Sequence, residues 1–469
     1  MISLSSKRWT TGVLSRLVVA GTGVAALVLA IYQAPDWLAS WSTGAAVGAV
    51  GVSSALVLAA IAIAAYGNAG VVKRIAAEVI LLAAALLAAE FVLVARAPEG
   101  WSDDPVLQRM AARERAAAAQ GLAYDRRFPA DVVGEYRSQG HEAVSRFAQQ
   151  ITGSSEIASA VRERGLLPLS NVSSTTVVEC NEGNGFLVFR SDEFGFNNPP
   201  GLASGPVDIA IIGESLALGH CVPPSTSAVD RIRNRFPRTV NLGITGSRVL
   251  AQLGVFREYV EPLEPPVIVW FLNLNAAEAR DEGSQPLLTR YLNDETFSQH
   301  LRERQHDVDE FQRDFVVPLQ LGRDAMLREK RDDLAFPLDR VIKLREVRSL
   351  IDFGSLLPQA PQAPDLSHFD RALAQVVDKA RGWNGQVILV LLPSYETVTQ
   401  SPQSVARYEA ILGAVDPSMV GLVDGVALFD EQRDKPSLFT LRIDNHPSER
   451  GHAVLADAVI AAIQSRINP

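Results

Sequence analysis

Three apolar windows near the N-terminus constrain this chain more than any other feature of its sequence. They span Val13–Tyr32, Ala45–Tyr66 and Ala76–Ala95, and each is long and apolar enough for a helix that crosses a bilayer, which needs about 20 residues. Their high content of Ala and Gly is typical of helices that pack closely in lipid. A cleaved signal peptide would account for the first window alone, and that window is long for one. The sequence therefore predicts a membrane anchor of three transmembrane helices over residues 1–96.

The charges beside these windows predict an orientation. Lys7 and Arg8 precede the first window, whereas the loop Gln33–Thr43 contains neither Lys nor Arg. The second loop contains Lys73 and Arg74. Loops rich in Lys and Arg stay on the cytoplasmic side of a membrane. We therefore expect a multi-pass protein of the inner membrane, with a cytoplasmic N-terminus and a periplasmic C-terminal domain.

The rest of the chain has the composition of an ordinary globular protein. The net charge of −9 argues against nucleic acid as a partner, because phosphate binding requires clustered Lys and Arg. The two cysteines, Cys180 and Cys221, lack the spacing of a zinc site, so neither a metal nor a cofactor is expected. They are either joined in a disulfide, which a periplasmic location permits, or two separate core residues.

Beyond the anchor, the sequence predicts two further regions. Residues 97–172 are expected to form a stalk and a lead-in subdomain, and residues 173–469 an α/β domain. Short runs rich in Ile, Val and Leu alternate there with helical patterns, as in a parallel sheet with helices on both faces. The predicted strands are Val207–Ile212, Val240–Leu242, Val267–Leu272, Val387–Leu392 and Val423–Phe429.

A long segment, about residues 276–386, separates the third predicted strand from the fourth. Much of it is charged and favours helix, and a crossover between strands needs far fewer residues. We expect a helical insertion that forms a cap or a surface for a protein partner.

Polar residues at the ends of the predicted strands suggest catalysis. Ser215 follows a buried strand and a glycine, at a place where the start of a helix stabilises negative charge. A serine needs a base to remove its proton, and His446 is the candidate, with Asp444 to orient it. The alternatives are a helix N-cap for Ser215 and an ordinary loop histidine for His446.

Two more blocks supply candidates for an oxyanion hole. Gly243 follows the second predicted strand and offers its backbone N–H. Asn275 lies just beyond the third strand and offers its side-chain amide, with Asn273 as the alternative. The blocks occur along the chain in the order Ser, Gly, Asn, Asp/His.

In this order the blocks resemble those of the SGNH/GDSL hydrolase superfamily, over roughly Ser191–Ile467. The phrase Ser-Asp-Glu-Phe-Gly-Phe-Asn-Asn-Pro that begins at Ser191 resembles a group of membrane-anchored members. The resemblance implies a three-layer, flavodoxin-like parallel sheet and the chemistry of esterases, lipases, carbohydrate O-deacetylases or O-acyltransferases. The catalytic residues that it implies are Ser215, Asp444, His446, Gly243 and Asn275.

Three positions depart from the motifs of the superfamily. Glu214 stands where Asp is usual, and Asn275 is followed by Ala276 where Asp is usual. Asp444 lies two positions before His446, whereas a spacing of three is common. These departures leave Ser215 and His446 in place.

The sequence supports two hypotheses of different classes. The first is a membrane-anchored serine esterase or O-acyltransferase that acts on acyl groups, above all acetyl, of an envelope carbohydrate. The second is a catalytically silent subunit that uses the same fold to dock a membrane protein partner. Retention of Ser215 with His446 favours the enzyme, and the altered motifs motivate the subunit.

Overall fold

The computed structural model describes residues 13–21, 60, 62–96, 104–183, 185–279, 286–332 and 363–467. The chain divides into two units. The first comprises Met1–Glu99 with Asp332–Pro358, and the second comprises Gly100–Arg331 with Gln359–Pro469.

In the first unit, α3 (Ala69–Arg96) is a helix of 28 residues. Its stretch Ala69–Leu93 has a mean hydropathy of 2.3 and is the one helix among the described residues that is long and apolar enough to cross a bilayer. This helix contains the third predicted window. The first two windows lie largely outside the described residues, where only short helical pieces at 13–21 and 62–66 are placed.

Lys73 and Arg74, the positive charges between the second and third windows, lie inside α3. The prediction that a loop holds them is therefore wrong. Only Gly67 and Asn68 separate residues 62–66 from α3. The Asn68 side chain accepts a hydrogen bond from the N–H of Gly70 at 2.8 Å, which lets the helix begin early. Arg74 then pairs with Glu78, one turn later on the same helix, at 3.3 Å.

The second unit is built on a parallel sheet of five strands in the order β5-β4-β6-β7-β8. These strands are β4 (Ile209–Gly213), β5 (Thr239–Gly243), β6 (Val267–Asn273), β7 (Gln386–Leu392) and β8 (Gly421–Asp424). Renumbered along the chain from β4, the order is that of flavodoxin-like sheets, in which sites form at the carboxyl edge where the strand order reverses. The predicted α/β class with a parallel sheet is confirmed, and the first four predicted strands are present.

The fifth predicted strand, Val423–Phe429, is wrong beyond Asp424. The Asp424 side chain accepts a hydrogen bond from the N–H of Ala427 at 3.0 Å. This contact caps a helix, α19 (Gly425–Asp430), so Val426 and Phe429, which suggested a strand, are buried on a helix instead.

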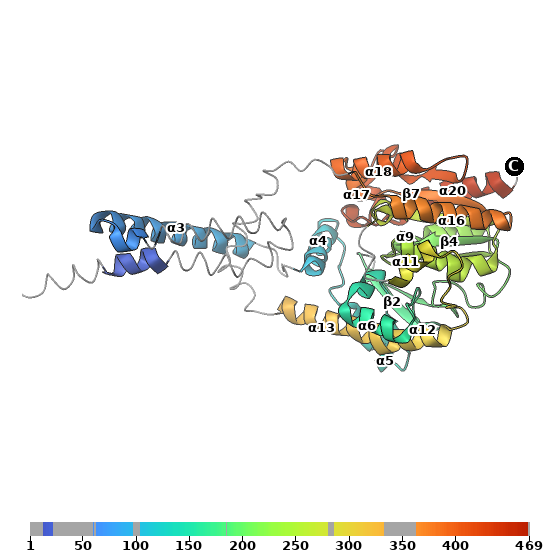
Figure 1. Ribbon diagram of the computed structural model, residues 1–469, viewed down its shortest axis with the longest axis horizontal. Helices are drawn as coiled ribbons and strands as arrows, with labels where there is room; N and C mark the ends of the chain where they lie inside the picture. The colour runs from blue at the N-terminus through green and yellow to red at the C-terminus, as the bar shows by residue number, and fades with distance from the viewer. Residues whose placement is uncertain are drawn as a thin grey trace, which may run out of the picture. The chain divides into compact units, whose positions relative to one another are not determined.

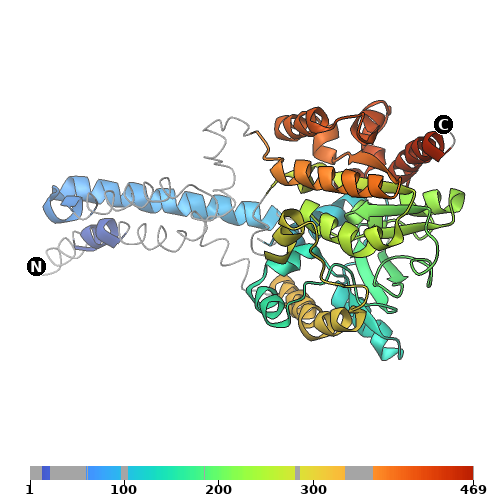
Figure 2. The ribbon, with the colours of Figure 1, turned by 45° about the vertical axis from the view of Figure 1, so that its right-hand side comes forward.

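Helices cover both faces of the parallel sheet, as Figures 1 and 2 show. Ala210 and Ile212 of β4 pack in a core with helices α9 and α16 on one face. Ile209 and Ile211 pack in a core with α8 and α20 on the other face. The covering helices are α8 (Ala228–Arg235), α9 (Val249–Val255), α16 (Ser367–Gly382) and α20 (Glu449–Ile467). Because neighbouring strand residues point to opposite faces, the result is a three-layer domain.

A smaller sheet precedes the parallel one along the chain, and the sequence did not predict it. In it β1 (Ala143–Ser145) runs parallel to β2 (Thr176–Asn181), which pairs antiparallel with β3 (Phe186–Arg190). Its strands β2 and β3 mix apolar residues with polar ones, such as Glu179, Asn181 and Arg190, and so lack the continuous apolar runs that mark the parallel strands. The turn that follows β2 carries Glu182, which lies at the candidate active site.

The described part of the insertion is helical and packs on the smaller sheet. A continuous helical stretch runs through α12 (Gln305–Phe311), a π-helical turn (Gln312–Val316) and α13 (Val317–Asp332). Val317 and Leu321 of α13 pack against residues of β1 and β2. Other helices of this unit are α4 (Pro105–Ala119), α5 (Pro129–Ser138), α6 (Ser155–Arg164), α7 (Ser215–Leu218), α10 (Leu274–Ala277), α11 (Pro286–Asn293), α17 (Tyr395–Val398) and α18 (Pro402–Ala414).

Candidate active site

Ser215 lies at the turn from β4 to α7, at the carboxyl edge of the parallel sheet. Gly213, the last residue of β4, has a φ of +147°, and a Cβ there would lie 2.5 Å from the carbonyl oxygen of Phe271. Only glycine fits this approach. The chain therefore turns sharply after β4, and Ser215 becomes the first residue of α7.

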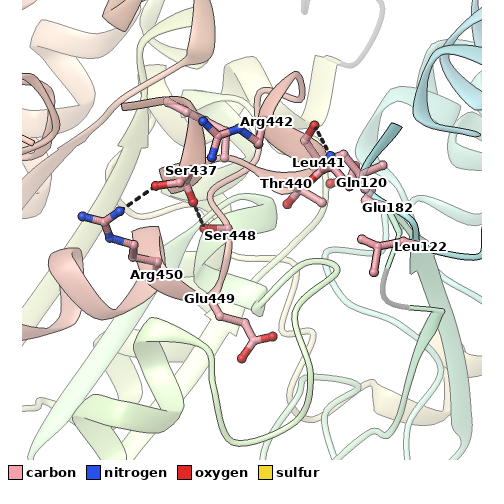
Figure 3. Close-up of a pocket in the computed structure, with 11 residues that line it drawn as sticks. Gln120, Leu122, Glu182, Ser437, Thr440, Leu441, Arg442, Ser448, Glu449 and Arg450 are labelled. Carbon is pink, nitrogen blue, oxygen red and sulfur yellow. Dashed lines mark hydrogen bonds between the residues drawn. The ribbon is translucent and has the colours of Figure 1, made fainter. Parts of the chain in front are cut away.

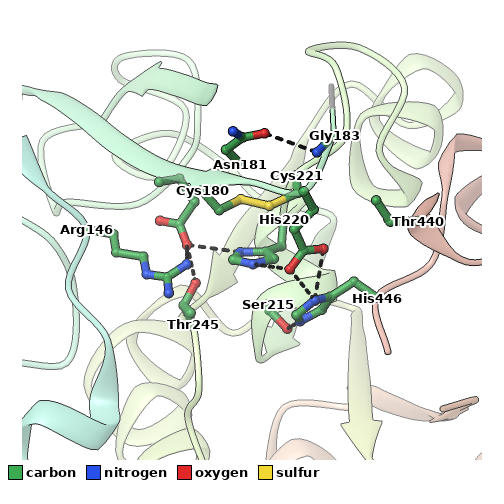
Figure 4. Close-up of a disulfide and its surroundings, with 12 residues drawn as sticks. Arg146, Cys180, Asn181, Gly183, Ser215, His220, Cys221, Thr245, Thr440 and His446 are labelled. Carbon is green, nitrogen blue, oxygen red and sulfur yellow. Dashed lines mark hydrogen bonds and ion pairs between the residues drawn. A yellow bond between two sulfur atoms is a disulfide. The ribbon is translucent and has the colours of Figure 1, made fainter. Parts of the chain in front are cut away.

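Three side chains form a hydrogen-bonded series at this turn (Figure 4). Nε2 of His446 lies 3.0 Å from Oγ of Ser215. Nδ1 of the same ring lies 2.9 and 3.1 Å from the two carboxylate oxygens of Glu182. A hydroxyl, an imidazole and a carboxylate in this order can act as a nucleophile, its base and the group that orients the base.

Asp444, which was expected to orient His446, has a different set of contacts. Its Oδ1 lies 3.7 Å from Nδ1 of His446, beyond hydrogen-bond distance. That oxygen accepts the N–H of Asn445 at 2.8 Å, so the loop itself holds the carboxylate. Its Oδ2 lies 2.5 Å from Nε of Arg113. The acid in hydrogen-bond contact with the imidazole is therefore Glu182 rather than Asp444.

The carboxylates determine the electrostatics around His446. Burial acts to raise the pKa of Glu182, but the positive charges of His446 and Arg113 outweigh it and hold that pKa well below its ordinary value. Burial acts to lower the pKa of His446, but Glu182 and Asp444 outweigh it and raise the pKa to about 10. The resting imidazole therefore holds a proton at neutral pH, and base catalysis requires its release.

A second buried pair, His220 and Glu179, lies beside the first (Figure 4). Nδ1 of His220 lies 3.1 Å from Oε1 of Glu179, and its Nε2 lies 3.5 Å from Oε1 of Glu182. Each member of this pair precedes a cysteine, and Cys180 and Cys221 are joined in a disulfide. The sequence left open whether these cysteines are bonded, and the structure joins them. The disulfide ties β2, the strand that leads to Glu182, to the segment that follows α7.

Gly243, expected to serve an oxyanion hole, is engaged elsewhere. Its N–H donates a hydrogen bond to the side-chain oxygen of Asn241 at 2.9 Å. A Cβ at this position would lie 2.4 Å from the backbone nitrogen of Leu218, so α7 packs directly on the glycine. The structure thus accounts for Gly243 by close packing, and an oxyanion role would require the N–H to leave Asn241.

The two candidate asparagines differ in how they relate to Ser215. The side-chain oxygen of Asn275 accepts a hydrogen bond from Arg407 at 2.7 Å. The side-chain nitrogen of Asn273 donates to Oε1 of Glu214 at 2.7 Å, and that oxygen lies 3.4 Å from Oγ of Ser215. Burial raises the pKa of the Glu214 carboxyl group. Asn273 is thus connected to Ser215 through Glu214, whereas Asn275 is directed toward α18.

The phrase that begins at Ser191 supports β5 from the side of the smaller sheet. The carboxylate of Asp192 accepts the N–H groups of Phe194 and Phe196 and a side-chain hydrogen bond from Asn198, all at 2.8 to 2.9 Å. Asn198 in turn donates to the carbonyl of Asn241 at 2.9 Å and accepts its N–H at 2.7 Å. The phrase therefore acts as a structural link between the two sheets.

A cavity of about 270 Å³ borders Glu182 (Figure 3). Gln120 and Leu122 line it from the end of α4 and the residues after it, and Thr440 and Arg442 line it from the segment before His446. Neither Ser215 nor His446 is among its lining residues. The cavity thus adjoins the acid and does not mark the position of a substrate bond at the nucleophile.

Among the described residues, two groups bring three metal-binding side chains within 4.8 Å of one another. One consists of Cys180, His220 and Cys221, but sulfurs joined in a disulfide offer no thiolate to a metal. The other consists of Glu182, His220 and His446, and hydrogen bonds and ion pairs account for its geometry.

Sequence reasoning missed Glu182 and Arg113. Glu182 lies in the turn after β2 and belongs to no motif, and Arg113 lies in a helix that was expected to be a stalk. One signal was available: Glu179 lies between Val178 and Cys180 in a short apolar run, Glu182 follows three positions later, and buried carboxylates need partners.

Comparisons with known proteins add little to this geometry. No family model matches the chain. No curated protein matches it. Among solved structures, a similar chain from Desulfitobacterium hafniense DCB-2 is described as a lipolytic protein of the G-D-S-L family. It shares 12% identity with a TM-score of 0.30, and the match covers 54% of this chain and 98% of that one. Similarity at this level carries no argument about activity.

Proposed function

We propose that this protein is an SGNH-type serine esterase or O-acyltransferase. In this proposal Ser215 is the nucleophile, His446 the general base and Glu182 the acid that orients it. The observation that carries the proposal is the continuous series of hydrogen bonds from Ser215 Oγ through both ring nitrogens of His446 to Glu182. The position of Ser215 at the carboxyl edge of a flavodoxin-ordered sheet also supports it.

The first half of the reaction transfers the acyl group to the enzyme. Nε2 of unprotonated His446 takes the proton of Ser215 while Oγ forms a bond to the carbonyl carbon of an ester. The carbonyl oxygen gains the electron pair, and in this proposal the N–H of Ser215 at the start of α7 donates a hydrogen bond to it. Collapse breaks the bond to the leaving alcohol, which takes the proton from His446. The products are an acyl-Ser215 enzyme and the free alcohol.

The second half repeats these steps with a new nucleophile. Water attacking the acyl group gives hydrolysis, and an acceptor hydroxyl gives transfer. His446 removes the proton of either one and returns it to Ser215 Oγ. Glu182 remains ionised throughout and stabilises the imidazolium.

We further propose that the substrate is an acyl ester, above all an acetyl ester, of an envelope carbohydrate. The apolar helix α3 is compatible with a membrane anchor. The disulfide between Cys180 and Cys221 is compatible with an oxidising compartment. The carbohydrate itself is suggested by the resemblance to the superfamily together with this location.

The test is hydrolysis of an activated acetyl ester by the full chain in detergent. We expect turnover by the wild-type protein and loss of turnover in Ser215→Ala. Ser465→Ala, an exposed serine on α20, is the control and should retain the wild-type rate. A fluorophosphonate probe should label the wild type and the control, and leave Ser215→Ala unlabelled. Equal rates in the wild type and Ser215→Ala would contradict the proposal.

The second candidate is a catalytically silent subunit that docks a membrane partner. The observation that favours it is the N–H of Gly243, which is bonded to Asn241 rather than free for an oxyanion. This hypothesis predicts that neither turnover nor probe labelling depends on Ser215, and that a membrane protein copurifies with the full chain.

A further inference from the structure

Arg113 connects helix α4 to both carboxylates that face His446. Its Nη2 lies 2.5 Å from Oε1 of Glu182, and its Nε lies 2.5 Å from Oδ2 of Asp444. The side chains of Arg113, Glu182 and Asp444 are 17%, 1% and 13% exposed. Water therefore screens these charges little, and their interactions are strong.

We propose that Arg113 is a positioning residue of this site. By binding both carboxylates it neutralises Asp444 and leaves Glu182 as the partner of His446. The inference rests on the proposed function, since it assigns a role within the same reaction.

The reason lies in the balance of charge around His446. The titratable groups that interact with His446 are Glu182, Asp444, Glu214, His220 and His452. Arg113 and Tyr124 interact with the two carboxylates Glu182 and Asp444. Among these groups, Arg113 carries the charge that does not depend on pH. Without it, two like-charged carboxylates would flank one imidazole, repel each other and hold the imidazolium proton more tightly.

The ends of α4 are arranged to keep Arg113 in this place. Asp104 caps the helix by accepting the N–H of Val106 at 2.8 Å. At the other end, Gln120 donates to the carbonyl of Leu441 at 3.1 Å. Leu441 lies just before Asp444, so α4 contacts the loop that carries Asp444 and His446 at two points. The helix is thus part of the site and more than a connection to the preceding segment.

The test uses a charge-restoring double variant of the full chain in detergent. At a fixed, mildly alkaline pH, we expect Arg113→Gln to lower kcat for the activated acetyl ester by about 100-fold with little change in KM. Arg113→Gln combined with Asp444→Asn has the same net charge as the wild type. We expect the pair to recover to within about tenfold of the wild-type kcat. Arg113→Lys, which keeps the charge and loses the second donor, should fall between the wild type and Arg113→Gln.

The matched control is Arg109→Gln, an exposed arginine one turn earlier on α4, which should behave as the wild type. A double variant no more active than Arg113→Gln would overturn the inference, because a merely structural arginine is not rescued by removing a carboxylate. Thermal unfolding identifies variants that do not fold. If Arg113→Gln is among them, Arg113→Lys is compared with Arg113→Lys/Asp444→Asn. The double variant is expected to have the higher kcat, and a kcat no higher than that of Arg113→Lys would overturn the inference. Absence of turnover that depends on Ser215 in the wild type would be a separate result, and it would contradict the proposed function.

Discussion

At the scale of single residues, the site depends on how two carboxylates share one imidazole. Glu182 is 2.9 Å from Nδ1 of His446, and Asp444 is 3.7 Å from it. A hydrogen bond needs the shorter distance, whereas a charge acts over either one. Glu182 therefore orients the ring, and Asp444 influences it through its charge and through Arg113.

Separate substitutions of the two acids should distinguish these roles. We expect Glu182→Gln to lower kcat/KM by about 10⁴-fold, as when the acid of a triad is converted to an amide. Asp444→Asn should remain within about tenfold of the wild type, because the hydrogen bond to Glu182 is retained. Hydrolysis of the activated acetyl ester measures both. The reverse ranking would return the orienting role to Asp444.

The pH dependence of activity follows from the raised pKa of His446, about 10. The base must be unprotonated to accept the proton of Ser215, and below that pKa it is mostly protonated. We therefore expect kcat/KM, which reports the free enzyme, to rise with pH from neutrality until the pH reaches that pKa. Asp444→Asn removes a negative charge that lies near the ring, which lowers the pKa of His446 and should move the rise to lower pH. A wild-type profile that is already flat at neutral pH would contradict this expectation.

At the scale of secondary-structure elements, the site is assembled from both sheets of the second unit. The turn after β4 supplies Ser215, the turn after β2 supplies Glu182, and the loop before α20 supplies His446. The disulfide from Cys180 to Cys221 and the link from Asp192 through Asn198 to β5 hold the two sheets in register. The smaller sheet is therefore part of the catalytic unit.

Removal of the disulfide should weaken both stability and activity. The bridge closes a segment with a sequence separation of 41, and constraints of that length contribute about 3–4 kcal/mol to the free energy of unfolding. We expect Cys180→Ser/Cys221→Ser to lose about that much and to lose activity, because β2 is no longer tied to the segment after α7. Chemical unfolding and ester hydrolysis measure the two effects. A double variant with unchanged midpoint and rate would show that the hydrogen bonds alone suffice.

At the scale of the whole molecule, the chain combines an apolar helical unit with an α/β unit. In the first unit, α3 has the length and hydropathy of a membrane span, and Lys73 and Arg74 lie near its start. Positive charges at that end favour a cytoplasmic start and an exit on the opposite side. The proposed chemistry on an envelope substrate requires this orientation.

Fusions to alkaline phosphatase, which is active only outside the cytoplasm, should report the topology. A fusion after Ser40 and one at the C-terminus are expected to be active, and one after Ile75 inactive, because Lys73 and Arg74 stay inside. Activity of the fusion after Ile75 together with silence of the C-terminal fusion would reverse the proposed orientation and exclude an external substrate.

The sequence by itself determined the features that are encoded locally. Runs of Ile, Val and Leu predicted four strands of the parallel sheet, because a strand buried on both faces must be apolar throughout. The order of strand-end motifs selected Ser215 and His446, which the structure brings to 3.0 Å. The predicted strand Val423–Phe429 was wrong beyond Asp424 because a short apolar run fits either a strand or a helix. The cap at Asp424 selects the helix.

Only the tertiary structure decided which acid faces His446. Glu182, Arg113 and the partners of the cysteines are set by contacts across distant parts of the chain, and no local pattern records such contacts. Asp444 was the natural expectation because it is close to His446 in sequence, yet its own loop and Arg113 hold its carboxylate. Glu182 reaches the ring because β2 and its disulfide place the turn there. Proximity in sequence suggested Asp444 as the orienting acid, whereas packing between the two sheets brings Glu182 to His446.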